Sequence, residues 1–202
     1  MAYRRTPQIQ ARLDAQRAAL VTAATTILAE AGYAGCSVSA VAAKAEVAAG
    51  TVYKHFASKA ELVAEVFRSV VTHEVEVVRA AASSGTAIER TAAVIETFAG
   101  RALRAPRRAY ALLAEPVDPA IDELRLEFRR AFRDVFADAI DGGVAIGELP
   151  EQNATLVAAA LVGAVGEALI GPLATGQRPP DPVPSLIEFA TRAVGGHVHA
   201  DA

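Results

Sequence analysis

T-V-Y-K-H-F-A-S-K, residues 51–59, is the stretch of sequence that decides the fold of this chain. It follows A-A-K-A-E-V-A-A-G, residues 42–50, and Ser37 precedes both segments. Together, residues 37–63 predict a helix that begins after Ser37, a tight turn, a second short helix and the start of a third. Basic and aromatic residues gather on the second helix. A helix-turn-helix that binds duplex DNA has this layout.

The spacing of these residues also resembles that of a known family. The pattern Gly-Thr-x-Tyr-x-His-Phe-x-Ser-Lys-x-x-Leu occupies residues 50–62, with Gly32-Tyr33 and Ser37 upstream of it. It resembles the N-terminal domain of the TetR family of transcriptional regulators. The resemblance implies an all-α fold, in which a three-helix helix-turn-helix domain precedes a larger helical domain for ligand binding and dimerisation.

Two positions depart from the family pattern. Glu46 stands in the turn where the family usually has glycine, and Ala48 stands where the next helix usually begins with serine. A left-handed backbone at Glu46 would cost on the order of 1 kcal/mol relative to glycine. Loss of a serine N-cap removes about 1 kcal/mol of helix stability. Neither departure removes the helix-turn-helix, but both bear on its affinity for DNA.

By resemblance, contacts with the DNA backbone fall to Ser37, Tyr53, His55 and Lys59. Their chemistry suits phosphate, because tyrosine and histidine carry donors on rigid rings and lysine carries a point charge. The following helix would also present free N–H groups to an anion.

Contacts with the bases should fall to Ala48, Ala49, Thr51 and Lys54. Alanine and the threonine methyl can contact thymine methyl groups, and lysine can approach guanine acceptors. Because these side chains form few hydrogen bonds, we expect sequence discrimination to depend partly on DNA shape and on two half-sites acting together.

Charge is divided unevenly along the chain. Residues 1–60 carry seven basic and three acidic residues, a net charge of +4, whereas the remainder carries 13 and 20, a net charge of −7. A basic N-terminal third on an acidic body favours local DNA binding. Arg4, Arg5 and Arg12 are equally consistent with a flexible arm that contacts DNA and with a solvated tail.

Composition favours helices throughout. Hydrophobic residues make up 52% of the 202 residues but aromatic residues only 5%, so alanine, valine and leucine must build the core. Alanine favours helices and is depleted in strands. The single cysteine, Cys36, excludes an internal disulfide and is expected in the core. The basic N-terminus lacks a following apolar segment, so we expect a cytoplasmic protein.

Periodicity and turn residues divide the chain into a helix-turn-helix domain at 1–57, a regulatory and dimerisation domain at 58–195, and a flexible tail at 196–202. Beyond the helix-turn-helix, Ser58 and Glu61 form the pattern of a capping box at the start of a long helix. The expected helices cover residues 12–31, 38–45, 48–55, 58–82, 87–104, 107–113, 120–140, 151–173 and 185–194.

The last two predicted helices, 151–173 and 185–194, are the best candidates for a homodimer interface. Two helices from each subunit would give the four-helix interface that the family resemblance implies. Intramolecular core is the alternative for the first helix, which is also nearly long enough to span a membrane, although Glu167 within it favours a buried helix. Its small and apolar residues include Ala158, Ala159, Val162, Val165, Gly166 and Leu169.

A ligand pocket, if present, should lie between the middle helices. Phe128, Phe132 and Phe136 recur at helical spacing and form an aromatic stripe that suits either core or pocket lining. A mostly apolar cavity with a few polar groups would suit a hydrophobic small molecule. The candidate lining residues are Phe98, Arg101, Tyr110, Glu115, Phe128, Phe132 and Glu167.

The sequence thus predicts a homodimeric transcriptional repressor released from a palindromic operator by a small effector. An enzyme is a weaker alternative, because no hydrolase, phosphate-loop or metalloprotease pattern is present, and we expect no catalytic residue, metal or cofactor. The His197-x-His199 pair lies in a glycine-rich end. Another alternative is a helical small-molecule-binding module with a degenerate DNA-binding function, which Glu46, Ala48 and Ala49 would favour.

Overall fold

The computed structural model describes residues 6–175 and 181–195, and it contains helices but no strands within these ranges. This confirms the predicted all-α class. Arg4 and Arg5, and the predicted tail at 196–202 with His197 and His199, lie outside the described residues. The helices are α1 (Pro7–Gly35), α2 (Val38–Lys44), α3 (Ala49–His55), α4 (Lys59–Ala81), α5 (Ala87–Arg104), α6 (Pro106–Leu113), α7 (Pro119–Ala145), α8 (Ala154–Thr175) and α9 (Val183–Ala193).

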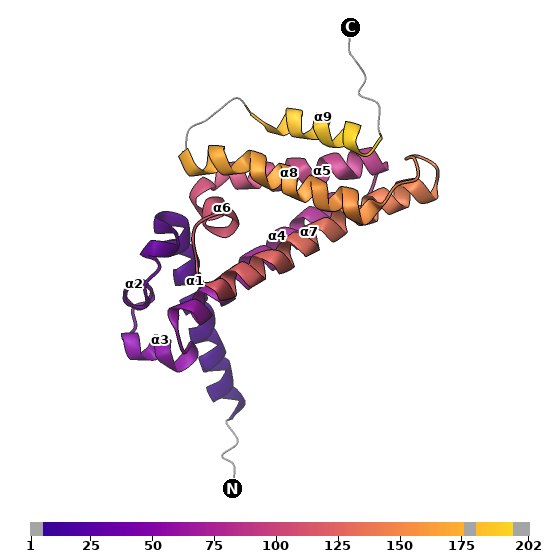
Figure 1. The fold of residues 1–202 in the computed structure, drawn as a ribbon. Coiled ribbons are helices and arrows are strands. Elements are labelled where there is room, and N and C mark those ends of the chain that lie inside the picture. The colour runs from indigo at the N-terminus through magenta and orange to yellow at the C-terminus, as the bar shows by residue number, and fades with distance from the viewer. Residues whose placement is uncertain (1–5, 176–180, 196–202) are drawn as a thin grey trace.

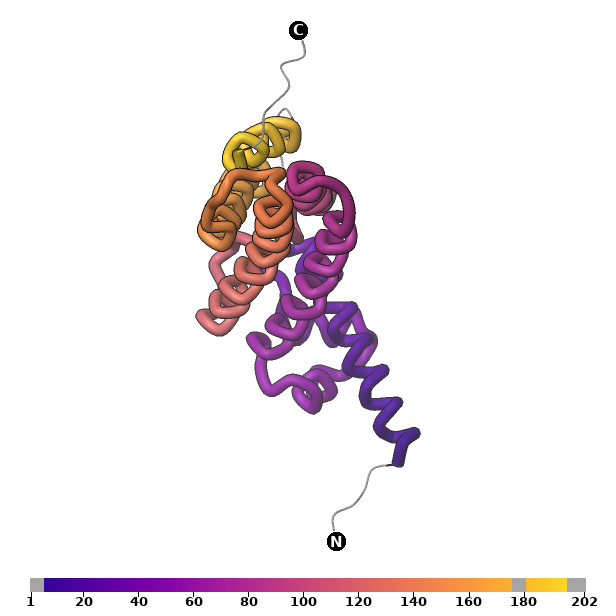
Figure 2. The backbone as a smooth tube through the Cα atoms, turned by 90° about the vertical axis from the view of Figure 1, so that its right-hand side faces the viewer, coloured from indigo at the N-terminus to yellow at the C-terminus, as the bar shows by residue number. Residues whose placement is uncertain are grey.

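The long helices α4 and α7 lie side by side and join the two ends of the molecule (Figures 1 and 2). Helices α1, α2 and α3 form one end, and α5, α8 and α9 form the other. Each end has its own apolar core. Phe67 of α4 belongs to the first core, whereas Val71, one turn later, belongs to the second. The two cores therefore share α4, and a domain boundary at residue 57 stays a prediction.

Helix starts follow the capping residues. Ser58 Oγ accepts a hydrogen bond from the N–H of Glu61 at 3.1 Å, which satisfies one donor in the first turn of α4. The Glu61 carboxylate accepts from the N–H of Ala57 at 2.6 Å. In a complete capping box the Glu61 side chain would accept from the N–H of Ser58, so the expected box is only partly formed. The complete box occurs at α5, between Thr86 and Glu89.

Helix α1 differs from its prediction at its start. It begins at Pro7, and Arg12 therefore lies inside a helix instead of on a flexible arm. At its other end Gly32 is non-helical, with φ 67° and ψ −172°, so the long helical segment ends there as predicted, and one further turn continues after the bend to Gly35. Glycine adopts this left-handed conformation without a steric penalty, so the chain can turn and continue.

Helix α7 also continues past its predicted end. It extends through Gly142 and Gly143 to Ala145, because neither glycine has a positive φ, and the next glycine that does is Gly147. A Cβ on Gly143 would lie 2.5 Å from the Cβ of Ala87 and 3.0 Å from Cγ of Leu149. The glycine pair therefore permits packing instead of ending the helix.

Helix α8 is the one helix in the described ranges that is long and apolar enough to cross a membrane, yet only 28% of its most apolar window is buried. In the single chain, α8 is therefore buried along one side only. Ala158, Val165 and Leu169 enter the second core, whereas the opposite side is exposed, with Leu156 at 66%. Its exposed small residues include Ala159, Ala160, Gly163, Ala168 and Gly171.

Candidate DNA interface and ligand pocket

Helix α3 has one buried side and one exposed side. Val52 on the helix and Phe56 just after it are 0% and 1% exposed, and they fix α3 against the first core. Ala49 and Lys54 are exposed on the other side, and Tyr53 is 57% exposed. A large aromatic residue left so far in solvent is available to a partner surface, which a recognition helix requires.

The turn before α3 carries the strain that the sequence predicts. Glu46 has φ 53° and is the only non-glycine residue with a positive φ in the described ranges. Hydrogen bonds from the N–H groups of Glu46 and Val47 to the carbonyls of Ala43 and Ala42, at 3.2 and 2.9 Å, close the turn. Ala48 takes the N-cap position of α3 and offers no side-chain cap. Both expectations for the turn are confirmed.

Three of the four residues expected at phosphates already have internal partners. Ser37 Oγ accepts from the N–H of Ala40 at 3.1 Å and so begins α2. His55 Nε2 lies 2.9 Å from Gln16 Oε1. Tyr53, the fourth, is exposed. These contacts position the α2–α3 unit, and DNA contacts at Ser37 and His55 stay predictions.

Lys59 is the third residue with an internal partner. Its ammonium donates to the carbonyl of Tyr33 at 2.9 Å and lies 4.0 Å from the centre of the Tyr33 ring. The cation therefore joins the start of α4 to the bent end of α1, and this contact stabilises the bend.

An ion pair joins α1 to α4. Arg17 donates to Glu65 at 2.8 Å, and its guanidinium lies 4.8 Å from the centre of the Phe56 ring. The hydrogen bond from Arg17 lowers the pKa of Glu65 below its ordinary value. Both side chains are partly exposed, so the pair mainly fixes orientation and contributes modestly to stability.

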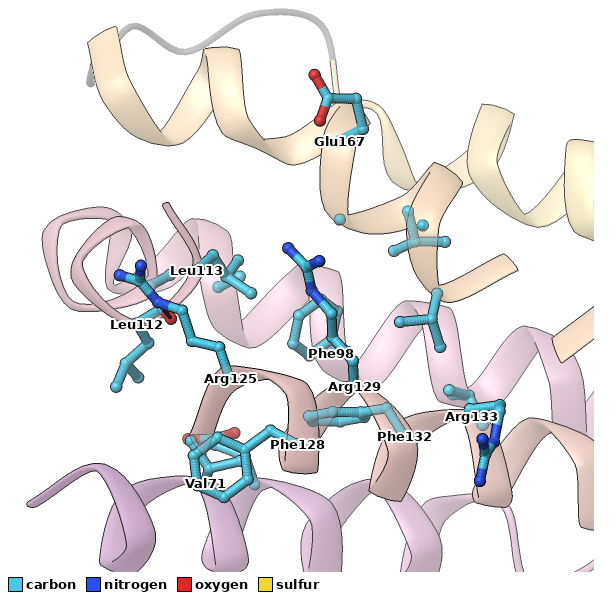
Figure 3. A pocket seen from close by; sticks show the side chains of 18 of the residues that line it. Val71, Phe98, Leu112, Leu113, Arg125, Phe128, Arg129, Phe132, Arg133 and Glu167 are labelled. Atoms are coloured by element: carbon cyan, nitrogen blue, oxygen red, sulfur yellow. Dashed lines mark hydrogen bonds between the residues drawn. The ribbon is translucent and has the colours of Figure 1, made fainter. Parts of the chain in front are cut away.

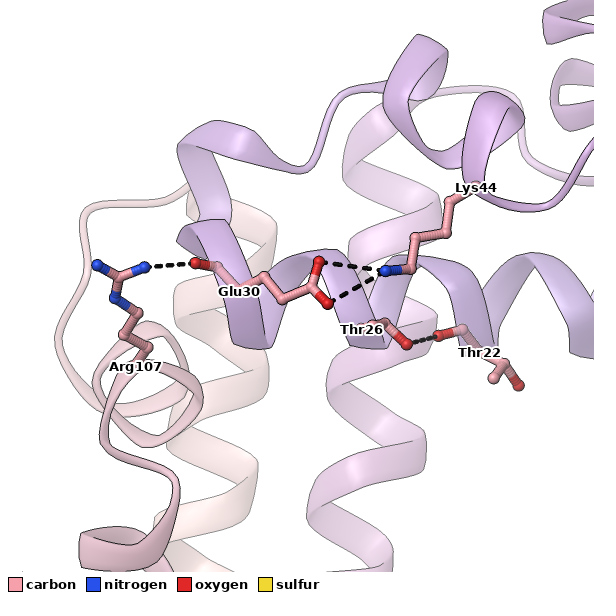
Figure 4. A network of polar contacts seen from close by, with 5 residues as sticks. All are labelled: Thr22, Thr26, Glu30, Lys44 and Arg107. Atoms are coloured by element: carbon pink, nitrogen blue, oxygen red, sulfur yellow. Dashed lines mark hydrogen bonds and ion pairs between the residues drawn. The ribbon is translucent and has the colours of Figure 1, made fainter.

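A second set of polar contacts joins the helix-turn-helix region to α6. Arg107 donates to the carbonyl of Glu30 at 2.6 Å, and the Glu30 carboxylate accepts from Lys44 at 3.1 and 3.2 Å. Figure 4 shows Glu30 between the two cations, with Lys44 reaching it from α2. Helices α1, α2 and α6 are thereby connected through one residue.

The α6–α7 turn, residues 114–118, contacts the bend of α1 directly. The Glu115 carboxylate accepts from the N–H groups of Tyr33 and Ala34 at 2.8 and 3.4 Å. The Tyr33 hydroxyl donates to Asp118. Burial is the main cause that raises the pKa of Tyr33 to about 12, and this hydrogen bond is the second cause. Glu115 was expected in the ligand pocket, and it lies instead at the junction of the two ends of the molecule.

A cavity of about 470 Å³ lies between α4, α5, α6, α7 and α8. Phe98 and Phe132 form part of its wall, with ring centres 4.9 Å apart and planes tilted by 60° (Figure 3). Arg101, Phe128 and Glu167 also line it, as the sequence predicts. Tyr110 packs against the second core, as Phe98 and Phe132 do, but it is not among the residues that line the cavity. Ligand binding by the predicted residues stays a prediction.

The charged groups of the pocket are paired to different degrees. Glu74 on α4, with 14% of its side chain exposed, accepts from Arg101 at 2.5 and 2.9 Å and pairs with Arg108 at 3.5 Å. This contact raises the pKa of Arg101. Arg129 and Arg130 on α7 also line the pocket, and both are exposed. Neither has a hydrogen bond or ion pair with any residue that the structure describes.

The sequence of residues 20–66 matches the family described as "Bacterial regulatory proteins, tetR family". The matched range contains α2, α3 and the exposed side of α3 described above. Residues 20–66 therefore form an N-terminal domain of the TetR type, and the chain is a DNA-binding transcriptional regulator. No curated protein matches the chain at a significant level.

Solved structures share the fold of this chain along most of its length. FadR from Bacillus subtilis, in complex with stearoyl-CoA, has a TM-score of 0.76 at 22% identity, covering 90% of this chain and 99% of that chain. FadR from Bacillus halodurans has a TM-score of 0.71 at 18% identity, with the same two coverages. A TetR regulator from Haloarcula marismortui has a TM-score of 0.77 at 16% identity, covering 90% and 97%.

The sequence predictions for this regulator missed the cations of α7. Arg125, Arg129 and Arg133 line the pocket and recur every four residues, each one position after an apolar residue of the inner face. This repeat could have predicted that the arginines border the pocket, because residues four apart lie on the same side of a helix. Glu74 and the junction residue Asp118 have no such signal, since their partners are distant in sequence.

Proposed function

We propose that the chain is a homodimeric repressor whose affinity for its operator falls when an anionic effector with a long apolar tail fills the pocket. The observation that carries the proposal is the cavity of about 470 Å³, walled by phenylalanines and bordered by arginines. It lies against α4, the helix that both cores share. The protein would act by binding, without catalysis, in the cytoplasm.

In the proposed complex, α3 enters the major groove. Ala48, Ala49, Thr51 and Lys54 face the bases, and Ser37, Tyr53, His55 and Lys59 face the phosphates. The exposure of Ala49, Tyr53 and Lys54 supports this orientation. The internal bonds of His55 and Lys59 would either be exchanged for phosphate contacts or be kept to position α3.

A homodimer would bring two copies of α3 to successive half-sites, which lie about 34–36 Å apart on B-DNA. The exposed side of α8 supports an interface there, because Leu156 is 66% exposed and the neighbouring positions are small. A Cβ added at Gly171 would meet no atom within 4 Å, which is consistent with space for a partner beside this part of α8. Phe189 of α9 is a second large apolar residue that is exposed, at 49%.

The effector class follows from the lining. Phenylalanine, valine and leucine side chains bind an apolar tail, and arginine binds an anionic group such as a carboxylate or phosphate. The complex of B. subtilis FadR with stearoyl-CoA and the description of B. halodurans FadR as a regulator of fatty acid degradation support a fatty-acyl effector.

Operator binding is tested by fluorescence anisotropy with DNA that flanks the protein's own gene, at two salt concentrations, with random DNA as competitor. We expect binding that weakens steeply with salt, because phosphate contacts release counterions. It should also resist the competitor. Binding that random DNA removes equally well at both salt concentrations would contradict a specific regulator of that DNA.

The effector is tested in the same assay with stearoyl-CoA, stearate and free coenzyme A. We expect stearoyl-CoA or stearate to release the DNA and coenzyme A alone to have no effect, because the cavity wall is apolar. Release by stearate alone would assign a carboxylate as the anionic group. Release by neither acyl compound would contradict the fatty-acyl class and leave DNA binding to be judged by the first assay.

A further inference from the structure

We propose that Arg125 senses the anionic group of the effector and that Glu115 transmits the change to the helix-turn-helix domain by holding the bend of α1. This inference deepens the proposed function and rests on it for the identity of the signal. The contacts themselves link a pocket residue to the bend of α1 through the α6–α7 turn. Arg125 and Glu115 are positioning residues in this scheme.

The bend of α1 leaves backbone donors without a helical partner. At Gly32 the φ of 67° and ψ of −172° turn the chain out of the helix, so the next N–H groups point away from it. The Glu115 carboxylate accepts from both, Tyr33 at 2.8 Å and Ala34 at 3.4 Å. A carboxylate that accepts backbone N–H groups at a helix break is an effective cap, because the bonds are charge-assisted.

Glycine at position 32 is required for this approach. A Cβ there would lie 2.9 Å from each oxygen of the Glu115 carboxylate, closer than real Cβ contacts occur. The positive φ also disfavours any other residue. The geometry of the bend and the position of Glu115 therefore depend on each other.

Arg125 fixes the turn that carries Glu115. Its guanidinium donates to the carbonyls of Ala111 and Leu112 at 2.9 Å each, and to the carbonyl of Glu115 itself at 2.6 Å. Only 13% of the Arg125 side chain is exposed. One planar group thus joins the end of α6 to the turn. Lysine offers no such planar fork.

Arg125 also lines the pocket, where Figure 3 shows its guanidinium beside Leu112 and Leu113. Its partners toward the turn are neutral carbonyls, whereas an anionic ligand would offer hydrogen bonds roughly twice as strong. An effector head group can therefore draw the guanidinium away from the turn. Its only ionic partner in the described ranges is Asp122, which is itself exposed.

The other pocket cations are less suited to this role. Arg101 and Arg108 already share the carboxylate of Glu74. Arg129 and Arg130 are exposed and bond to no residue in the described ranges, so their movement would disturb no contact with the α1 bend. Arg125 is the pocket arginine whose hydrogen bonds reach the turn that holds α1.

Release of the turn would loosen the bend just before Ser37, where α2 begins. The position of α2 and α3 relative to the body would then be less fixed, and two heads in a dimer would fit the operator less well. Allosteric coupling in proteins typically changes affinity by roughly 5- to 150-fold.

The first test needs no effector. Amide hydrogen exchange of Tyr33 and Ala34 is measured in the native protein, in Glu115→Gln, in Arg125→Lys and in Glu123→Gln. Glu123 is an exposed residue of α7 and serves as the matched control. We expect exchange on the order of tenfold faster in the first two variants, because a charged hydrogen bond is lost or loosened. The control should behave as the native protein.

Native protection in Arg125→Lys would overturn the link between pocket and bend, and native protection in Glu115→Gln would overturn the capping role. Thermal unfolding of each variant, followed by circular dichroism, shows whether it is folded. If Arg125→Lys does not fold, Glu115→Gln with its isosteric side chain still tests the capping role, and Arg125→Gln replaces Arg125→Lys as the test of the link.

The second test adds stearoyl-CoA and measures effector binding and DNA release separately. We expect Glu115→Gln to bind stearoyl-CoA with the affinity of the native protein. Stearoyl-CoA should weaken the DNA affinity of the native protein by at least about fivefold, but that of Glu115→Gln by less than about twofold. Full release in Glu115→Gln would overturn the proposal. Failure of stearoyl-CoA to act on the native protein would count against the proposed effector, and the exchange test would still decide the role of Arg125.

Discussion

The helix-turn-helix region and the ligand pocket differ in how some of their charged side chains are paired. Near α3, the cations Arg17, Lys59 and the ring of His55 each have an internal partner at 2.8 to 2.9 Å. In the pocket, Arg129 and Arg130 are exposed and lack such partners among the described residues. The first region is fixed as a unit, whereas the second retains charge and space for a ligand. Helix α4, the α1–α6 contacts and the contacts at the α1 bend join the two regions, and a signal between them can pass through these connections.

The largest expected effect is on the fixed region. Phe56→Ala removes a side chain that is 1% exposed and that Arg17 covers. We expect a loss of about 3–5 kcal/mol in unfolding free energy, because the cavity left behind cannot close fully. DNA binding should be lost with it. Denaturant unfolding measures the change.

Ile146→Ala is the matched control for this prediction, because Ile146 is 78% exposed. It should change the unfolding free energy by no more than about 0.5 kcal/mol. Equal losses in the two variants would show that the core around Phe56 is not the fixed region described here.

The next effect concerns Lys59, which belongs to the fixed region by its internal contacts. Lys59→Ala should weaken binding to all DNA sequences by about tenfold, since a charged hydrogen bond to Tyr33 is removed from the bend. Anisotropy titrations at several salt concentrations separate two origins. A salt slope reduced by about one indicates a phosphate contact, and an unchanged slope indicates a positioning role.

Arg79→Ala provides the comparison for Lys59, because Arg79 is an exposed cation near the far end of α4. It should leave both affinity and slope unchanged. If Lys59→Ala also leaves both unchanged, the proposed orientation of the helix-turn-helix on DNA is wrong.

Local sequence signals predicted the helix-turn-helix region well. Ser37 and Ser58 begin their helices, Glu46 takes the left-handed conformation, and Ala48 leaves α3 without a side-chain cap. Each of these depends on residues within four positions, so the pattern contains the information. The resemblance to the family pattern also predicted which residues of α3 contact DNA, and of these Ala49, Tyr53 and Lys54 are exposed.

The junction could not be predicted in the same way. Gly32 is typical of a helix end, but whether the chain stops or bends depends on Glu115, which is 83 residues away in the sequence. The place of Tyr110 outside the cavity lining could not be predicted for a similar reason, because periodicity identifies one side of a helix but not what that side contacts. Phe98 and Phe132 were predicted to line the pocket and do so, because this cavity is lined by large apolar residues of the kind that also form the core.

A smaller effect is expected at Tyr53, on the exposed side of α3. Tyr53→Phe removes only the hydroxyl, and a single hydrogen bond is worth about 1 kcal/mol, so affinity should fall by roughly fivefold for every DNA sequence. Thr51→Ala should instead alter sequence preference, because a threonine methyl can contact thymine. Binding to a panel of operator variants distinguishes the two. A sequence-dependent loss in Tyr53→Phe would contradict its assignment to phosphate.

The smallest expected effect is a loss of stability that appears only at high pH. It tests the contact between Tyr33 and the α6–α7 turn. Burial and the hydrogen bond to Asp118 raise the pKa of Tyr33 to about 12, so the folded protein favours its neutral form. The resulting stability is fully present below the ordinary tyrosine pKa near 10 and is lost as pH rises from there through about 12. Ultraviolet titration should show a late tyrosine step that Tyr33→Phe removes. If the same late step persists in Tyr33→Phe, the hydroxyl of Tyr33 is not held at the α6–α7 turn, and the bend of α1 is less fixed than the rest of the helix-turn-helix region.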